Sequence, residues 1–459
     1  MVTIEVIDSV WTRICPEAQK HLQPILQYDH FYWRKTAYGS EKVVQKHFMI
    51  EEHSDGFFIL TGLVPRAIKA LRKKKVKHEL ISNLDDVECC EPDIEGYKFR
   101  DYQKRLVDAA LDHGRGILVA PTGTGKSIVL LGITAAYKEE NILFLVHTKD
   151  LMYQMKKDFE TAFPNEEIGE WSAKKKSIQR ITVATVQSYI KVAVKYSDHF
   201  DVILIDEVHH VSGLETQYAQ VLMRSSAHTK LGLTATKRPD NKGQWAAEAL
   251  LGPVLAEYTM NEAQDDDVLA TPTIHLYKSP AFDIPINYTQ YEDKYDIGIV
   301  LNQVRNYKIV EVANKFIKQR KVVLITVTSI DHGERIKEYF EEEGIEIEFI
   351  YGKSSSAERD RIKDGLKDRS IKCAIASVIF LEGINIPTLD VVINASAGVS
   401  PIQTVQRIGR ALRKTEDKDS AILVDFMDET SGTLKRQSEK RIKTYESKGW
   451  KIVHMNRRK

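Results

Sequence analysis

The segment Ala120-Pro121-Thr122-Gly123-Thr124-Gly125-Lys126-Ser127 constrains the fold more than any other part of the chain. It begins at the last residue of the apolar run 117–120 and precedes a helix-length segment. This is the setting in which such a loop binds phosphate. Glycines let successive backbone amides point at phosphate oxygens, and the following helix adds its positive end. We therefore predict an ATP-binding loop formed by Thr122, Gly123, Thr124, Gly125, Lys126 and Ser127, in which Lys126 reaches the β and γ phosphates and Ser127 binds Mg²⁺.

Short apolar runs alternate with helix-length polar segments on both sides of this loop. They lie at 117–120, 142–146, 181–184, 202–205 and 231–233, and then at 322–325, 373–376, 391–394 and 421–425. The two sets are separated by an irregular stretch at about 271–306. This alternation is typical of parallel sheets covered on both faces. The sequence thus predicts an α/β protein with two α/β units in tandem.

The first 92 residues follow a different pattern of short strands and helices, which predicts a small α+β domain. Asp55-Gly56 between apolar-rich segments indicates a hairpin. A basic segment follows, with positive charges at Arg66, Lys69, Arg72, Lys73 and Lys74. It is either a solvated helix surface or a patch that grips duplex DNA. An acidic, turn-rich passage at 85–95 then indicates a domain boundary.

Composition limits the possible classes of protein less than the motifs do. The 459 residues contain 66 Lys and Arg against 65 Asp and Glu, so attraction to phosphate must come from charges gathered locally. The four cysteines have no metal-ligand spacing, and the apolar runs are far shorter than the roughly 20 residues that a bilayer requires. The first residues do not show a basic segment followed by a long apolar one, so we expect no secretory signal. We expect a reduced, cytoplasmic protein without zinc or membrane contact, whose basic last 25 residues are helical and exposed.

An acidic pair follows the apolar run 202–205. Carboxylates at the carboxyl end of a central strand lie beside the phosphate loop in such sheets. We predict that Asp206 holds Mg²⁺ and that Glu207 orients and deprotonates the attacking water. His209 is expected to couple the site to other parts of the protein, and His210 is expected to have no special role, since adjacent histidines cannot both face one ion from a regular element.

A helix-forming segment in the second α/β unit carries Gln406, Arg410 and Arg413 near one face. Guanidinium groups so placed can enter a neighbouring nucleotide site as arginine fingers. In nucleotide hydrolases a finger of this kind contributes roughly 10³ to 10⁵ in rate. Basic helical faces are common, so this segment gains its meaning from the loop and the acidic pair.

The motifs APTGTGKS, DEVHH, TAT and QRIGRALR, in this order, resemble those of superfamily 2 helicases across about Phe99 to Asp425. The resemblance implies two RecA-like domains that use ATP and Mg²⁺. It implies that Gln103 reads adenine, that His209, Thr234 and Thr236 couple hydrolysis to movement, and that Gly383 and Asn385 sense the nucleotide. Contacts to the nucleic-acid strand are implied at Thr148, Lys149, Gln154, Thr185, Gln187, Ser188 and Ser377. Asn385 stands where many relatives have Asp, and His147 where Pro is usual.

The small basic domain before the motor looks like that of phage UvsW-type helicases, which remodel forked and branched DNA. The resemblance implies a DNA helicase acting in replication, recombination or repair, in the host cytoplasm if it is phage-encoded. We expect a monomer. We divide the chain into an N-terminal domain (1–92), a first RecA-like domain (93–272), and a linker with a second RecA-like domain and basic tail (273–459). Two alternatives stay open: a duplex translocase that separates no strands, and an RNA helicase or remodelling switch.

Overall fold

The computed structural model describes the whole chain except residues 37–38, 85–86, 236–240, 280–283, 285–287, 289, 378–385, 387, 399–420 and 456–459. The chain divides into two compact units, the first comprising residues 1–120 and 125–259 and the second comprising residues 121–124 and 260–459. Within the described residues, every helix is too short or too polar to cross a membrane.

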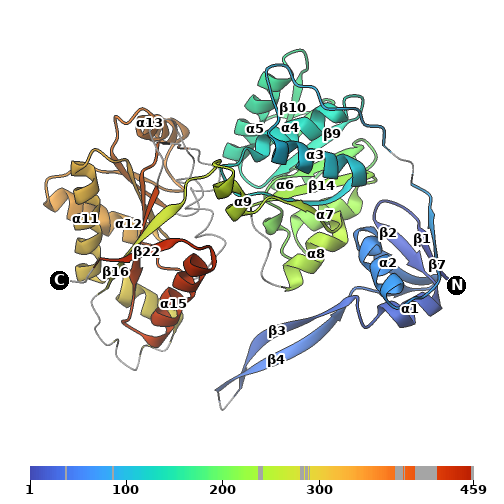
Figure 1. Ribbon diagram of the computed structural model, residues 1–459, viewed down its shortest axis with the longest axis horizontal. Coiled ribbons are helices and arrows are strands. Elements are labelled where there is room, and N and C mark those ends of the chain that lie inside the picture. Colours follow the sequence, from blue (N-terminus) through green and yellow to red (C-terminus); the bar gives the residue numbers. More distant parts are fainter. Residues whose placement is uncertain are drawn as a thin grey trace. The chain divides into compact units, whose positions relative to one another are not determined.

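A small α+β fold opens the chain (Figure 1). Its five-stranded sheet has the order β5-β6-β2-β1-β7, in which β1 pairs antiparallel with β2 and parallel with β7. The strands are β1 (Val2–Val6), β2 (Trp11–Ile14), β5 (Glu51–His53), β6 (Gly56–Leu60) and β7 (His78–Ser82), and the helices are α1 (Pro16–Leu22) and α2 (Val64–Lys73). β5 and β6 pair antiparallel from His53 to Gly56, which confirms the hairpin predicted at Asp55-Gly56.

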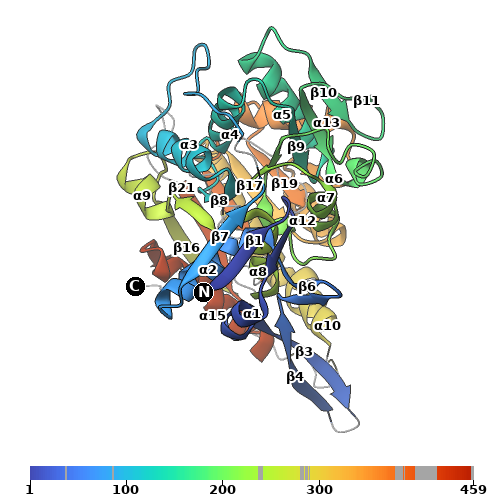
Figure 2. The ribbon, with the colours of Figure 1, turned by 90° about the vertical axis from the view of Figure 1, so that its right-hand side faces the viewer.

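This region contains a second hairpin that was not predicted from the sequence. Strands β3 (Gln27–Thr36) and β4 (Gly39–Phe48) pair antiparallel along their full ten-residue lengths and form a two-stranded sheet of their own. Figures 1 and 2 both show this ribbon leaving the small fold. The one glycine near its turn, Gly39, follows Tyr38 in the sequence. The sequence therefore carries no Asn-Gly or Asp-Gly signal there.

An eight-stranded sheet forms the first α/β fold, with the order β11-β10-β12-β9-β13-β14-β8-β15. Its described neighbours are parallel except for the pair β10 and β11. Every residue of β9, β12, β13 and β14 is buried, as expected for a sheet covered on both faces. The strands are β8 (Arg115–Val119), β9 (Ile142–Val146), β10 (Ile168–Trp171), β11 (Lys176–Ser177), β12 (Ile181–Thr185), β13 (Val202–Ile205), β14 (Thr229–Thr234) and β15 (Val254–Glu257). The helices are α3 (Asp101–His113), α4 (Lys126–Ala136), α5 (Lys149–Ala162), α6 (Val186–Tyr189), the short 3-10 turn η2 (Val208–His210), α7 (Gln217–Arg224) and α8 (Asn241–Leu251).

The small fold and the first α/β fold share one hydrophobic core. One cluster of buried residues runs from Leu60 and Leu63 to Leu250 and Leu251 in α8. A Cβ atom at Gly62 would lie 2.4 Å from the carbonyl oxygen of Glu248, so only glycine permits this approach. The two folds therefore belong to one rigid body, although a turn-rich linker separates them in sequence.

Buried polar groups also join these two folds. Lys230 is almost fully buried, and its Nζ donates to the Ser9 carbonyl, the Ser9 hydroxyl and the carbonyls of Leu222 and Ser225. Arg115 donates to the Ser9 carbonyl at 2.6 Å. Burial and the nearby Arg115 charge lower the pKa of Lys230 well below its ordinary value. Because these acceptors compensate for lost hydration, the loop at Ser9 is fixed to the first α/β fold.

The second unit is built on a seven-stranded sheet with the order β18-β19-β17-β20-β21-β16-β22, in which all neighbours are parallel. Its strands are β16 (Pro272–Lys278), β17 (Val323–Val327), β18 (Glu348–Ile350), β19 (Cys373–Ser377), β20 (Val391–Asn394), β21 (Ala421–Met427) and β22 (Lys451–His454). Its described helices are α9 (Met260–Asp265), α10 (Tyr291–Tyr295), the π-helical turn η3 (Asp296–Val300), α11 (Gln303–Lys318), α12 (Ile330–Glu342), α13 (Ser356–Lys367) and α15 (Gly432–Ser447). Two parallel sheets after a small α+β fold confirm the predicted fold class.

The prediction of an exposed helical C-terminal tail is wrong in two respects. Helix α15 forms, but Arg441 on it is buried, and its Nε donates to Asp425 Oδ2 at 2.9 Å. Tyr445 donates to the same oxygen at 2.6 Å. The chain then continues as β22, which pairs with β16. An arginine neutralised by buried carboxylates resembles a surface residue in the sequence, which explains the error.

Candidate nucleotide and nucleic-acid site

The phosphate loop joins β8 to α4 and curls back on itself. Gly123 and Gly125 have φ values of 96° and 77°, in the left-handed region that favours glycine. The Thr124 hydroxyl donates to the Pro121 carbonyl at 2.8 Å, which closes the loop from within. Gly125 caps α4, and no side chain accepts from the first amides of this helix. The amides that precede and open α4 therefore keep the geometry of an anion site.

Lys126, the first residue of α4, has a nearly buried ammonium. Its side chain is 11% exposed, and its Nζ lies 3.6 Å from Glu207 Oε1. Neither this Nζ nor the buried Thr122 hydroxyl has a hydrogen-bond partner among the described residues. A desolvated ammonium that makes no hydrogen bond is costly unless a ligand supplies the acceptors. The Lys126 ammonium is therefore placed to bind an anionic group such as a phosphate.

The acidic pair lies directly after β13, as predicted. Burial and the neighbouring Glu207 charge raise the pKa of Asp206 to about 6, and Lys126 opposes this shift. Glu207 has φ 57° and ψ 55°, a left-handed conformation that is unusual for a residue with a side chain. Its amide donates to Asp206 Oδ1 at 2.9 Å. Two carboxylates held together beside a lysine form a site that a divalent cation would stabilise.

Three histidine rings lie next to one another beside the acidic pair, and we call His209, His210 and His147 the histidine row. His209 Nδ1 lies 3.2 Å from Glu207 Oε2. The His209 and His210 rings are 4.4 Å apart, and His210 lies 3.9 Å from His147 at the end of β9. From the sequence, His210 is expected to have no special role, and His147 is unusual only because Pro is common at its position. The structure instead brings the His210 ring close to the rings of both His209 and His147.

The predicted strand-contact residues gather at the carboxyl ends of the neighbouring strands β9 and β12. Gln187 donates to the carbonyl of His147 at 2.9 Å, and the Thr185 hydroxyl donates to Ser188 at 2.9 Å. The Thr148 hydroxyl caps α5 by accepting from Leu151 N. Beyond this cap, Lys149 and Gln154 are exposed. The histidine row thus ends where these residues meet.

Gln103 and Thr234 lie beside the phosphate loop. The Gln103 side-chain oxygen accepts from Arg100 N at 3.0 Å, so this oxygen helps to cap α3. Its amide nitrogen is directed at the loop, since it would lie 2.8 Å from a Cβ atom at Gly125. Thr234 ends β14, and its carbonyl accepts from Ala120 N at 3.0 Å. Both residues are therefore close enough to respond to a bound nucleotide.

The remaining predicted residues are placed only in part. Ser377 ends β19 in the second unit and is buried, and its hydroxyl has no partner among the described residues. Six predicted residues lie outside the described part of the chain: Thr236, Gly383, Asn385, Gln406, Arg410 and Arg413. Their roles stay predictions from the sequence.

The structure divides the basic residues of α2 into two groups. Lys69, Arg72 and Lys73 are exposed. Arg66 instead donates twice to Glu248 of α8, at 2.6 and 2.5 Å, and its guanidinium lies 4.3 Å from the centre of the Trp245 ring. Arg66 therefore fastens α2 to α8. Lys74 is exposed but donates to the carbonyl of His21.

Two family models match the chain. The model "Type III restriction enzyme, res subunit" matches residues 96–238, and the model "Helicase conserved C-terminal domain" matches residues 307–415. Among solved structures, the Saccharomyces cerevisiae protein Dbp5 bound to RNA and ADP is 18% identical with a TM-score of 0.57, over 77% of this chain and 89% of that one. This likeness shows the fold alone.

Curated relatives carry the same motor. The DNA 3'-5' translocase XPB2 of Sulfurisphaera tokodaii is 27% identical over 73% of this chain and 82% of that protein. A Rad25-type DNA 3'-5' helicase of Haloarcula marismortui is also 27% identical over 78% of this chain, which spans 56% of that longer relative.

A parallel sheet with a phosphate loop and an adjacent acidic pair, followed by a second parallel sheet, defines the class of ATP-driven helicases. This chain belongs to the superfamily 2 DNA helicases and has two RecA-like domains in tandem. It is similar to the ATP-dependent DNA helicase UvsW of Enterobacteria phage T4, with 25% identity over 77% of this chain and 72% of that protein. The family resemblance drawn from the motifs is thereby confirmed.

Proposed function

We propose that this helicase remodels forked or branched DNA as a monomer with 3' to 5' movement, in the cytoplasm of a phage host. The observation that carries the proposal is the exposed cationic surface on α2, in a small fold that shares its core with the first RecA-like domain. A duplex arm held there would keep a fixed position relative to Lys126 and the acidic pair, which lie in the same compact unit. The similarity to UvsW and the 3'-5' labels of the archaeal relatives support this reading.

Hydrolysis would use the groups around the phosphate loop. Lys126 and the amides at the start of α4 would bind the β and γ phosphates, and Gln103 would contact adenine. Ser127 and Asp206 fit Mg²⁺, which when bound would neutralise charge on the phosphates. Glu207 would take a proton from the attacking water. Arg410 and Arg413 are proposed as fingers from the sequence alone.

Coupling to the DNA strand would follow the histidine row. Glu207 contacts His209, His209 contacts His210, and His210 contacts His147. Gln187 holds the His147 carbonyl beside Thr148, Lys149, Thr185 and Ser188, which we propose as strand contacts together with Gln154 and Ser377. A change at the acidic pair could thus alter the grip on the strand backbone, with Thr234 as a second link.

Translocation on duplex DNA without strand separation is a second candidate function. The match to the restriction-enzyme model and the name of the archaeal translocase favour it. The two functions differ in the DNA that best activates the motor, because a translocase needs no branch.

ATP turnover measured with four nucleic acids tests the proposal: single-stranded DNA, linear duplex, a four-way junction or fork, and RNA. We expect the fork or junction to stimulate turnover most and to be unwound. Strongest stimulation by linear duplex without unwinding would favour the translocase. Strongest stimulation by RNA would overturn the assignment of DNA as the substrate.

A further inference from the structure

The β3-β4 hairpin has no role in the site described above. Its pairing runs unbroken from Gln27 opposite Phe48 to Thr36 opposite Gly39. Ten residues per strand give it a length of about 34 Å. A hairpin of two strands is marginally stable alone in water, so its base requires support and its faces tend to be covered.

Aromatic stacking supplies the support at the base. Tyr28 stacks on His47 across the strands, with ring centres 5.2 Å apart, and it also stacks on Trp245 of α8 at 6.1 Å. Arg66 lies against the same Trp245 and is paired with Glu248. One face of the hairpin base is thus bound to the helix that carries the shared core, and the hairpin belongs to the same compact unit as Lys126 and the acidic pair.

The opposite face carries three exposed apolar side chains. Phe31 and Val44 are direct cross-strand partners, and Phe48 lies further toward the base on the same face, because side chains alternate along each strand. Their exposed fractions are 55%, 56% and 50%. Isolated exposed apolar residues are ordinary. Two phenylalanines and a valine on one face of a narrow ribbon instead form a surface suited to binding a ligand.

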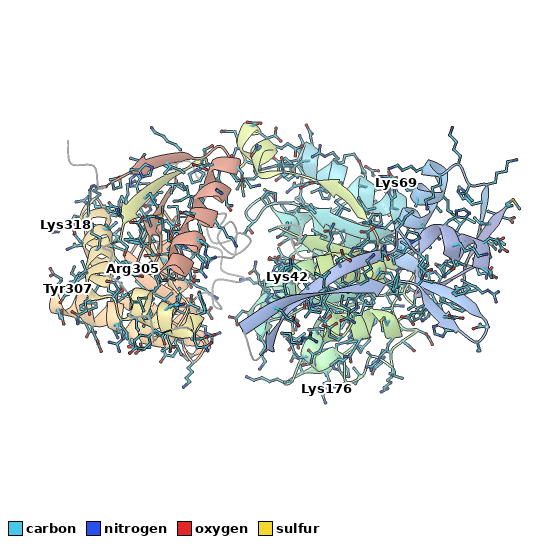
Figure 3. The ribbon with its side chains drawn as sticks, turned by 90° about the horizontal axis from the view of Figure 1, so that it is seen from below. Lys42, Lys69, Lys176, Arg305, Tyr307 and Lys318 are labelled. Atoms are coloured by element: carbon cyan, nitrogen blue, oxygen red, sulfur yellow. The ribbon has the colours of Figure 1, made fainter. Side chains whose placement is uncertain are left out.

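Positive charge lies within this apolar face. Lys42 Nζ is 4.2 Å from the centre of the Phe31 ring, and Lys46 is exposed beside Phe48. Among the described residues of this face, Asp29 is acidic and lies opposite Lys46. Arg34 and Glu41 pair with each other on the other face. Figure 3 shows Lys42 on the hairpin and Lys69 on α2. Rings beside ammonium groups favour a ligand that offers both flat bases and phosphates.

We propose that the apolar face formed by Phe31, Val44 and Phe48 binds bases of the DNA where the duplex opens, with Lys42 and Lys46 on the adjacent phosphates. Aromatic side chains stack on unpaired bases of any sequence, and apolar side chains inserted at a base step separate it. A two-stranded ribbon is also narrow enough to enter a groove of DNA. This inference rests on the proposed activity at forks and adds the surface that recognises the branch point.

The test uses full-length Phe31→Ala and Phe48→Ala, singly and together, with Phe31→Tyr as the conservative variant. Val194→Ala, which alters an exposed residue far from the hairpin in sequence, is the matched control. Each protein is mixed with a fork that carries 2-aminopurine at the branch point, and fluorescence, fork unwinding and ATP turnover on single-stranded DNA are measured. Because all replaced side chains are exposed, the thermal midpoints should agree.

We expect the double variant to lose the fluorescence change and to unwind the fork at least about tenfold more slowly. The loss of even one stacking contact corresponds to about this factor. Phe31→Tyr should behave as the unaltered protein, and turnover on single-stranded DNA should stay within twofold. Unchanged fluorescence and unwinding in the double variant would overturn the inference. A change confined to molecular mass in light scattering would show that the face binds a second copy instead, which also overturns it.

The same measurements separate this inference from the proposed function. If the unaltered protein turns over ATP with single-stranded DNA but is neither stimulated by forks nor able to unwind them, the proposed function fails. If the unaltered protein unwinds forks and the hairpin variants do so equally well, only the inference about the hairpin fails.

Discussion

At the scale of single residues, the buried Lys126 ammonium makes the sharpest test of the nucleotide site. Replacing Lys126 with Ala should reduce ATP turnover at least about 100-fold, since charge stabilisation at the phosphates is lost. The fold should persist, because Lys126 Nζ makes no hydrogen bond among the described residues and lies 3.6 Å from Glu207. Steady-state turnover and circular dichroism check both statements. Turnover within tenfold of the unaltered protein would contradict the role.

The histidine row leads to a second prediction for single residues. His210→Ala should leave basal ATP turnover within about threefold but remove most of its stimulation by DNA. The reason is that the ring of His210 contacts both His209 and His147, so its loss interrupts the row between Glu207 and the strand contacts. His113→Ala, at the exposed end of α3, is the control. If DNA still stimulates the His210 variant fully, the row does not carry coupling.

Sequence reasoning located most of this site but not the histidine row. The loop and acidic pair are contiguous motifs whose chemistry is specific to certain residue types, so their positions follow from the sequence alone. His147 and His210 are 63 positions apart, and only the pairing of β9 with β13 brings them together. The unusual His147 after a buried strand was the available signal.

At the scale of secondary-structure elements, α2 should bind DNA through three of its charges. Changing Lys69, Arg72 and Lys73 to Gln should reduce the slope of log affinity against log salt by up to about 3, since each phosphate contact contributes about 0.9. Fluorescence anisotropy with duplex DNA at several salt concentrations measures the slope. Unchanged slopes would support the alternative of a solvated surface.

Arg66→Gln is the matched control for that experiment. It removes one positive charge from the same helix but breaks the paired hydrogen bonds to Glu248. We expect a nearly unchanged salt slope together with a loss of about 1–3 kcal/mol in the free energy of unfolding, because Glu248 is left buried without its partner.

Packing between α11 and α12 makes the second unit sensitive to acid. Burial, with the charges of Arg305 and Arg335, lowers the pKa of His332 to about 3. In the unfolded chain this imidazole binds a proton near pH 6.5. The contribution of the neutral His332 to stability is therefore fully present above that pH and is lost as pH falls below it. The loss is about 1.4 kcal/mol per pH unit, or about 2 kcal/mol at pH 5.

Denaturant unfolding of the protein and of His332→Gln at pH 7 and pH 5 checks this. Glutamine stays neutral and can still donate to Asn306, the partner of His332. The stability advantage of histidine over glutamine should therefore decrease by about 2 kcal/mol between the two pH values. Equal pH dependence in both proteins would contradict it.

Among the elements, buried strands were predicted well and exposed or paired polar elements were not. The runs 142–146, 202–205 and 391–394 coincide with β9, β13 and β20, because continuous apolar residues are typical of covered parallel strands. The β3-β4 hairpin mixes charged and aromatic residues and has no strong turn signal, so neither alternation nor composition indicated it. Partner contacts, rather than local pattern, determine such elements.

At the scale of the whole molecule, the linker near Pro92 separates two sheets but not two cores. Residues from α2 and α8 share one hydrophobic cluster, and Ser9 supplies acceptors to both Lys230 and Arg115. Deleting residues 1–92 would expose this cluster to water and remove the Ser9 acceptors of Lys230 and Arg115.

We therefore expect a chain of residues 93–459 to aggregate or to unfold at least about 10 °C below the full-length protein, as measured by scanning calorimetry. Replacing residues 30–45 by a short Gly-Ser turn is the control, because it removes the outer hairpin but keeps Tyr28, His47 and the shared core. That variant should retain the midpoint of the full-length protein. If the 93–459 chain instead unfolded at the same temperature as the full-length protein, the N-terminal fold would be an independent attachment, and a duplex arm bound to α2 would have no fixed position relative to the motor.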